Sequence, residues 1–192
     1  MAGAVREPGD EVLILAPNWP LIEGIVRSFH GVPVAVPFLR VADSAESAVE
    51  IVAGQLSSRT VALYVATPNN PTGDVIPRAW LEALANWAAQ HDLWIWADEV
   101  YEDYLYQGEH TYTRPLAPER TFACHSFSKA YGMAGNRCGY VVGPRELMSE
   151  LRKVSTHTFY STPTAAQLAA VRALAGPGDL WAAAARDSYR EV

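Results

Sequence analysis

Short apolar runs of strand length alternate with helix-forming segments along the whole chain, and this alternation constrains the fold more than any other feature. The run Val61–Ala66 is apolar or aromatic at every position, as expected for a strand that is covered on both faces. The predicted strands are Glu11–Ala16, Val32–Val36, Val61–Ala66, Leu93–Ala97, Thr121–His125 and Cys138–Val142. The predicted helices are Leu21–Phe29, Ala45–Leu56, Arg78–His91, Arg145–Thr156, Thr164–Ala175 and a last one from Asp179 onward. This order predicts an α/β fold in three layers, with a mostly parallel sheet between helices.

Length and composition fit one domain of ordinary size. The chain has 192 residues, of which 49% are hydrophobic and 19% are charged, the balance of a globular protein. Its formal net charge of −6 argues against nucleic acid or an anionic membrane surface as a general partner. No apolar stretch approaches the ~20 residues that span a bilayer, and no signal peptide is visible. We therefore expect a cytoplasmic protein.

Several common kinds of site are missing from the sequence pattern. The five histidines show no zinc spacing, and we expect His125 to be a satisfied histidine near the core. Cys124 and Cys138 lack metal-ligand spacing and are predicted to be reduced thiols. No G-x-S-x-G elbow and no G-x-G-x-x-G or G-K-[ST] loop occurs, which removes the common serine-hydrolase and nucleotide-binding interpretations. We expect no metal.

Polar residues that can bind a ligand or take part in a reaction follow three successive predicted strands. Asn70 comes after one strand, Asp98 at the end of the next, and Lys129 after the third. In a parallel sheet the carboxyl ends of the strands meet at one edge, where ligands gather. We therefore expect these three side chains to form one site.

Lys129 is the strongest candidate for covalent chemistry. Lysine occurs only twice, and the other one, Lys153, follows Arg152 in a helix predicted to be exposed. Lys129 lies in the stretch Ser126-Phe127-Ser128-Lys129, just past an apolar strand. A loop there can present its amine to a cleft, where an amine can form a Schiff base with an aldehyde or ketone.

Each neighbouring candidate has both a functional and a purely structural interpretation. Asp98 can be the counter-charge of a protonated heterocyclic nitrogen, or it can cap the turn that follows it. Tyr101 would lie on the same side as Asp98 on a helical turn, or in the core. Asn70 can donate its amide to a ligand, or it can be only a turn residue. Ser126 and Arg137 can bind a phosphate together, or they can be a loop hydroxyl and a paired arginine.

Taken together, these stretches resemble the fold-type I pyridoxal-phosphate enzymes, specifically the class I/II aminotransferases related to aspartate aminotransferase. The matching stretches are Pro8–Val12, Ala16–Pro20, Asn69–Gly73, Asp98–Tyr101, Ser126–Lys129 with Arg137 and Gly139–Tyr140, and Ser161–Thr164. They occur in the order of the family and span almost the whole chain.

The resemblance implies a role for each candidate in holding pyridoxal 5'-phosphate. Lys129 would bind the cofactor as a Schiff base and then carry protons, and Asp98 would keep the pyridine nitrogen protonated. Tyr101 and Asn70 would donate hydrogen bonds to the phenolic oxygen of the cofactor. Trp19 and Val100 would contact the two faces of its ring. Ser126 and Arg137 would bind its phosphate, with Ser128 a weaker candidate. The implied reaction is transfer of an amino group between an amino acid and a 2-oxo acid, in a homodimer.

The resemblance also implies that parts of the family pattern lie outside this sequence. The upstream phosphate loop would precede Met1, and the small domain with the arginine for the substrate carboxylate would follow Val192. We therefore expect residues 1–192 to be a partial pyridoxal-phosphate-binding large domain, truncated at both ends.

Other functions fit the same motifs. One alternative is a different reaction on this scaffold, such as a carbon–sulfur β-lyase or a cyclopropane-forming synthase. Another is the transferase-like half of a transcriptional regulator, although no basic segment or recognition-helix pattern is present. A third is a non-catalytic remnant that retains only cofactor binding or is not stably folded.

Overall fold

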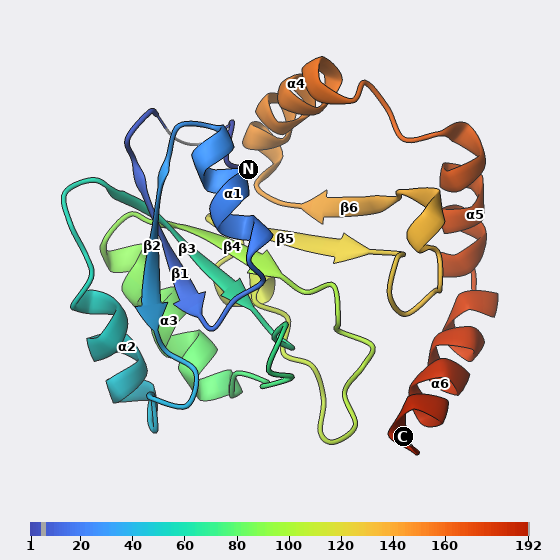
Figure 1. Ribbon diagram of the computed structural model, residues 1–192, viewed down its shortest axis with the longest axis horizontal. Coiled ribbons are helices and arrows are strands. Elements are labelled where there is room, and N and C mark those ends of the chain that lie inside the picture. Colours follow the sequence, from blue (N-terminus) through green and yellow to red (C-terminus); the bar gives the residue numbers. More distant parts are fainter. Residues whose placement is uncertain (5–6, 192) are drawn as a thin grey trace.

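A single six-stranded sheet with helices on both faces forms the centre of the molecule (Figure 1). The computed structural model describes residues 1–4 and 7–191. The strands are β1 (Glu11–Ala16), β2 (Val32–Pro37), β3 (Thr60–Ala66), β4 (Trp94–Asp98), β5 (Thr121–Ser126) and β6 (Gly139–Val142), in the spatial order β2-β1-β3-β4-β5-β6. Strands β1 to β5 are parallel and β6 is antiparallel to β5. The predicted mostly parallel sheet is confirmed.

The helices match the predicted segments with shifted ends. They are α1 (Leu21–Ser28), α2 (Ala45–Ala53), α3 (Arg78–Gln90), α4 (Met148–Thr158), α5 (Thr164–Leu174) and α6 (Pro177–Arg190), with short 3-10 turns η1 (Arg114–Leu116), η2 (Ala134–Asn136) and η3 (Arg145–Leu147). The predicted start of the last helix at Asp179 is two residues late. Pro177 fits the first turn because a proline there loses no intrahelical hydrogen bond.

Two hydrophobic clusters cover the two faces of the sheet. Leu13 and Leu15 of β1 belong to the cluster beneath α2 and α3, whereas Val12 and Ile14 belong to the cluster that includes α1. All four side chains are at most 2% exposed. Because successive residues of a strand face opposite sides, a strand buried on both faces is apolar throughout, as the sequence pattern predicts.

Helices α5 and α6 stand beside the sheet rather than on either of its faces (Figure 1). With the segment before them, they carry large apolar side chains that are more than half exposed: Phe159, Tyr160, Leu168, Val171, Leu174, Leu180, Trp181 and Tyr189. An exposed apolar surface of this kind is typical of an interaction site. Among the helices that the structure describes, none is both long and apolar enough to cross a membrane.

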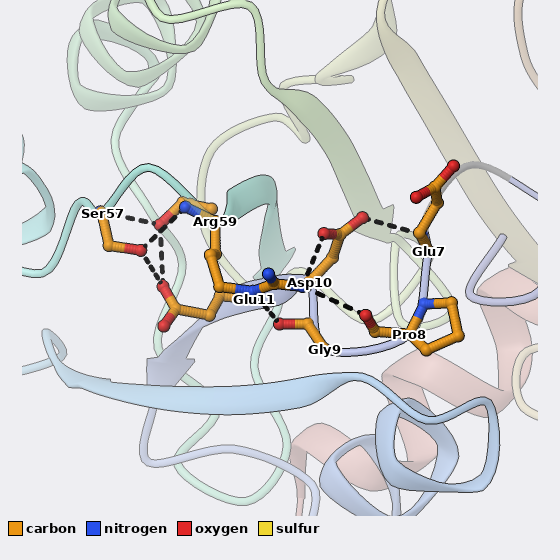
Figure 2. A network of polar contacts seen from close by, with 8 residues as sticks. Glu7, Pro8, Gly9, Asp10, Glu11, Ser57 and Arg59 are labelled. Atoms are coloured by element: carbon orange, nitrogen blue, oxygen red, sulfur yellow. Dashed lines mark hydrogen bonds and ion pairs between the residues drawn. The ribbon is translucent and has the colours of Figure 1, made fainter.

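A polar network joins the start of β1 to the start of β3 (Figure 2). The Arg59 guanidinium donates to the carbonyls of Gly9 at 2.7 Å and Pro8 at 3.1 Å. The Glu11 carboxylate accepts from the hydroxyls of Ser57 and Thr60. These contacts help to set the position of β1 next to β3, its neighbour in the sheet.

Glycine is required at position 9 of this network. Gly9 has φ +85, and a Cβ there would lie 2.7 Å from Arg59 Nη2. We expect Gly9→Ala to lower the free energy of unfolding by about 1–2 kcal/mol, because the left-handed region is unfavourable for alanine. The matched control is Gly24→Ala in α1, where a Cβ has open space, and here the change is expected to stabilise by about 0.5–1 kcal/mol. Denaturant unfolding measures both, and equal effects of the same sign would contradict the prediction.

Candidate active site

The carboxyl ends of β3, β4 and β5 lie side by side, as expected from the sequence. Ala66 is level with Asp98, and Asp98 is level with Cys124, in the register of these three strands. Asp98 is the last residue of β4 rather than the first residue after it. Lys129 follows the end of β5 at the same edge. Three separate stretches of sequence therefore deliver their polar residues to one place.

The Asp98 carboxylate is held by hydrogen bonds from two sides. The phenol of Tyr64 donates to Oδ2 at 2.6 Å, and the backbone N–H of Val100 donates to Oδ1 at 3.4 Å. Burial raises the pKa of Asp98 above its usual range, while these hydrogen bonds and the charge of Lys129 oppose the rise. Asp98 thus caps the following turn and also presents a carboxylate to the site.

The turn after Asp98, at residues 100–103, has i→i+3 hydrogen bonds without forming a regular helix, and Tyr101 lies on the same side as Asp98, as expected, since both line the cavity described below. The Glu102 N–H donates to the carbonyl of Glu99 at 3.0 Å, and the Tyr104 N–H donates to that of Tyr101 at 2.9 Å. The Tyr101 ring lies beneath the Lys129 ammonium, with Nζ 5.1 Å from the ring centroid. This contact brings an amine and a phenol together.

Two adjacent asparagines in the loop after β3 have different surroundings. Asn69 is buried, and its Oδ1 accepts from the N–H and hydroxyl of Thr72 at 3.2 and 3.0 Å. Its Nδ2 donates to the carbonyl of Pro17 at 3.2 Å. Asn69 therefore holds the loop in shape, and Asn70 lines the cavity described below.

The Lys129 loop is anchored on both sides of the lysine. Phe127 and Ala130 are at most 3% exposed, whereas Lys129 is exposed. The backbone carbonyl of Lys129 accepts from the Tyr104 hydroxyl at 3.1 Å and from the Gly132 N–H at 3.0 Å. Burying the neighbours makes Lys129 project from a fixed backbone. The other lysine, Lys153, lies on α4 and pairs with Glu150 at 2.6 Å, in the exposed position expected.

Ser126 and Arg137 approach the site from the two ends of the same loop. Ser126 ends β5, and its Oγ accepts from the Ser128 N–H at 3.1 Å. Arg137 precedes β6 in the left-handed region, with φ 52 and ψ 45, and its Nη1 donates to the Ala134 carbonyl at 2.8 Å. A non-glycine residue in this conformation is unfavourable and is often found at functional sites.

One cavity of about 310 Å³ brings all the candidate residues together. Its lining includes Trp19, Asn70, Asp98, Val100, Tyr101, Ser126, Ser128, Lys129 and Arg137. The lining also includes Tyr64, Ala66, Pro68 and Ala134, which the sequence did not single out. Tyr64 has a sequence signal in retrospect, because it is the one residue with a polar tip in an apolar run and shares a strand face with Ala66.

A second cavity of about 770 Å³ opens beside the first. Both are lined by Pro68, Asn70, Tyr101, Ser128 and Lys129. The second one is further lined by Tyr104, Leu105, Tyr106 and Tyr189. The lysine therefore stands between a smaller cavity that contains Asp98 and Arg137 and a larger one walled by Tyr104, Tyr106 and Tyr189.

A separate cluster of charged groups surrounds His125. Glu99 is fully buried, and its Oε1 accepts from the Thr113 N–H at 2.7 Å. His125 Nε2 lies 3.8 Å from Glu99 Oε2, and Nδ1 lies 3.0 Å from Glu102 Oε1. Burial alone would lower the pKa of His125, but the hydrogen bond and charge of Glu102 and the charge of Glu99 outweigh it and raise that pKa. Within the described residues these three groups lie within 4.8 Å of one another, close enough for one ion. We assign them an ion-pair role, since a protonated imidazole between Glu99 and Glu102 offsets part of their negative charge.

The chain belongs to the aminotransferase class I and II family, whose sequence profile matches residues 2–191. It is 41% identical to the probable aspartate/prephenate aminotransferase of Thermus aquaticus over 98% of this chain and 49% of that protein. It is 37% identical to the arginine–pyruvate transaminase of Pseudomonas aeruginosa over 88% of this chain and 44% of that protein. The solved aspartate aminotransferase of Thermus thermophilus with maleate superposes with a TM-score of 0.92 at 39% identity, over 99% of this chain and 50% of that one. The chain thus spans about half the length of the relatives it matches.

The charge on His125 gives the chain a pH-dependent stability. Because its folded pKa lies above the unfolded value of about 6.5, the contribution is fully present below that pH and is lost as pH rises through the folded pKa. We expect His125→Gln to lower the free energy of unfolding by roughly 2 kcal/mol at acid pH and by less at alkaline pH. Denaturant unfolding at the two pH values measures the difference, with His157→Gln on the exposed side of α4 as the control. A loss of equal size at both pH values would show that the protonated imidazole contributes nothing.

Proposed function

We propose that this chain holds pyridoxal phosphate in the 310 Å³ cavity and that it serves the transfer of an amino group between an amino acid and a 2-oxo acid. The observation that carries the proposal is one cavity lined by an exposed lysine amine and a half-buried aspartate carboxylate. Membership of the aminotransferase class I and II family supports the same chemistry.

The donor set of the cavity fits this cofactor group by group. The Lys129 amine suits an aldehyde, and the Asp98 carboxylate suits a protonated ring nitrogen. The Ser126 hydroxyl and the Arg137 guanidinium suit a phosphate, since a guanidinium fork binds phosphate oxygens well. Trp19 supplies an aromatic wall for a flat ring.

Asp98 is prepared for a cationic partner. Its carboxylate is half-buried, and an ion of opposite charge is the partner that compensates most for burial. When bound, the cofactor supplies an electron sink that stabilises negative charge at the α-carbon of an amino acid. Asp98 would keep the ring nitrogen protonated, which is the condition for that chemistry.

Lys129 has two roles at its Nζ atom. It is the amine that would attach the cofactor covalently, and as a free amine it would accept and return a proton at the α-carbon of a bound amino acid. Its anchored backbone limits the positions that Nζ can reach. The contact of Nζ with the Tyr101 ring keeps the amine on the side of the cavity where Asn70 and Tyr101 offer hydrogen bonds to a phenolic oxygen.

The remaining residues of the cavity would bind and orient the cofactor. Trp19 and Val100 are placed to contact the two faces of a ring, and Ser126 with Arg137 to bind the phosphate, with Ser128 beside them.

We propose an amino acid and a 2-oxo acid as substrates and a second copy of the chain as the protein partner. The exposed apolar side chains of α5 and α6 support an interaction surface of this kind. We further propose that residues 1–192 form the cofactor-holding part of a large domain, in line with the half-length match to relatives.

The test is a visible absorption spectrum of the purified chain with added pyridoxal phosphate. We expect a band near the visible range in the wild type that borohydride removes, with the reduced cofactor mapped to Lys129. The Lys129→Ala variant should show no such band, because the attaching amine is gone. The matched control is Lys153→Ala, which removes the other lysine and should keep the band. A folded wild-type chain without a band, or a label on Lys153 alone, would refute cofactor attachment at this site.

A further inference from the structure

We propose that the Tyr64 phenol is a positioning residue that orients the Asp98 carboxylate and keeps it in its charged form for a cationic ring nitrogen. This inference rests on the proposed function and deepens it. It concerns a residue that the family motifs of this sequence do not include, on a strand that contributes no other side-chain hydrogen bond to Asp98.

The contact between the two side chains is short and built into the sheet. Tyr64 Oη lies 2.6 Å from Asp98 Oδ2, within the range of hydrogen bonds to an ionised acceptor. Tyr64 lies on β3 and is level with Trp96 of β4, two residues before Asp98 in the register. Only 3% of Tyr64 is exposed, so the ring has little freedom to leave the contact. The phenol therefore reaches along the neighbouring strand to a fixed point.

The direction of this hydrogen bond follows from the acidities of the two groups. Burial and the neighbouring Asp98 raise the pKa of Tyr64 well above its usual range, so the phenol keeps its proton and donates it. Asp98 is the acceptor. A donor to a carboxylate favours the charged form, which is the form that a cationic nitrogen needs.

The other groups near Asp98 do not replace the phenol. Burial and the charge of Glu99 raise the pKa of Asp98, and the Val100 N–H and the charge of Lys129 lower it. Cys124 on β5 also faces Asp98, but burial raises the pKa of its thiol to about 12, so it stays neutral. Lys129 is exposed and its charge is screened by solvent. Tyr64 is the buried side chain that opposes the neutralisation of Asp98.

The arrangement also leaves one carboxylate oxygen available. Oδ2 accepts the short hydrogen bond from Tyr64, whereas among the described residues Oδ1 accepts only from Val100 N at 3.4 Å. A carboxylate oxygen has room for two donors. Because Tyr64 fixes Oδ2, the rotation of the carboxylate is set, and Oδ1 keeps capacity for a ring N–H donor.

The first test needs no cofactor. The Asp98 carboxyl carbon is followed by NMR over pH in the wild type and in Tyr64→Phe, with the signal assigned by Asp98→Asn. The phenylalanine keeps the ring and removes only the hydroxyl, so we expect the same fold and a carboxyl that titrates at higher pH. The control is Tyr140→Phe, which removes a phenol outside the cavity lining and should titrate like the wild type. A carboxyl that titrates at the same pH or lower in Tyr64→Phe overturns the inference.

The second test measures the dissociation constant of pyridoxal phosphate between about pH 6 and about pH 9. We expect Tyr64→Phe to weaken binding by ~10-fold at the acid end and by less at the alkaline end, because Asp98 neutralises earlier without its donor. The Tyr140→Phe control corrects for the titration of the ligand itself. A loss that does not change with pH indicates a packing role and overturns the inference. If the wild type fails to bind the cofactor, the proposed function fails, and the carboxyl titration still decides the role of Tyr64.

Discussion

The burial of the central strands on both faces is the constraint on which the rest of the structure depends. Strands β1 and β3 have helices on each side, so nearly every side chain along them must be apolar. A polar side chain is tolerated only where a strand ends or where a partner lies within reach. Asp98 lies where a strand ends, and Tyr64 has a partner within reach, because its hydroxyl donates a hydrogen bond to the Asp98 carboxylate. The same packing that stabilises the sheet therefore concentrates the reactive groups at one edge.

Much of this architecture could be predicted from the sequence. The parallel sheet followed from apolar runs such as Val61–Ala66, and the gathering of Asn70, Asp98 and Lys129 followed from the rule that parallel strands end at one edge. The errors concern element ends, since the last helix begins at Pro177 rather than at Asp179. Helix ends depend on local capping and tertiary contacts that a periodic pattern does not contain.

Contacts between residues far apart in sequence could not be predicted in this way. Tyr64 and Asp98 are neighbours only because β3 and β4 pair in a particular register. The same holds for His125, whose partners Glu99 and Glu102 show no spacing that points to it. Sequence reasoning identified the residues that a family motif marks, and it missed those whose role arises from pairing across strands. The roles of the marked residues themselves remain predictions.

The two adjacent asparagines after β3 differ in what their side chains contact. Asn69 is committed to the interior of its loop, with hydrogen bonds to Thr72 and Pro17. Asn70 makes its contribution to the cavity instead. A replacement of Asn69 would remove the hydrogen bonds that shape the loop, whereas a replacement of Asn70 would change the lining of the cavity. A substitution at position 70 can therefore change the chemistry of the cavity wall while the hydrogen bonds that shape the loop stay in place.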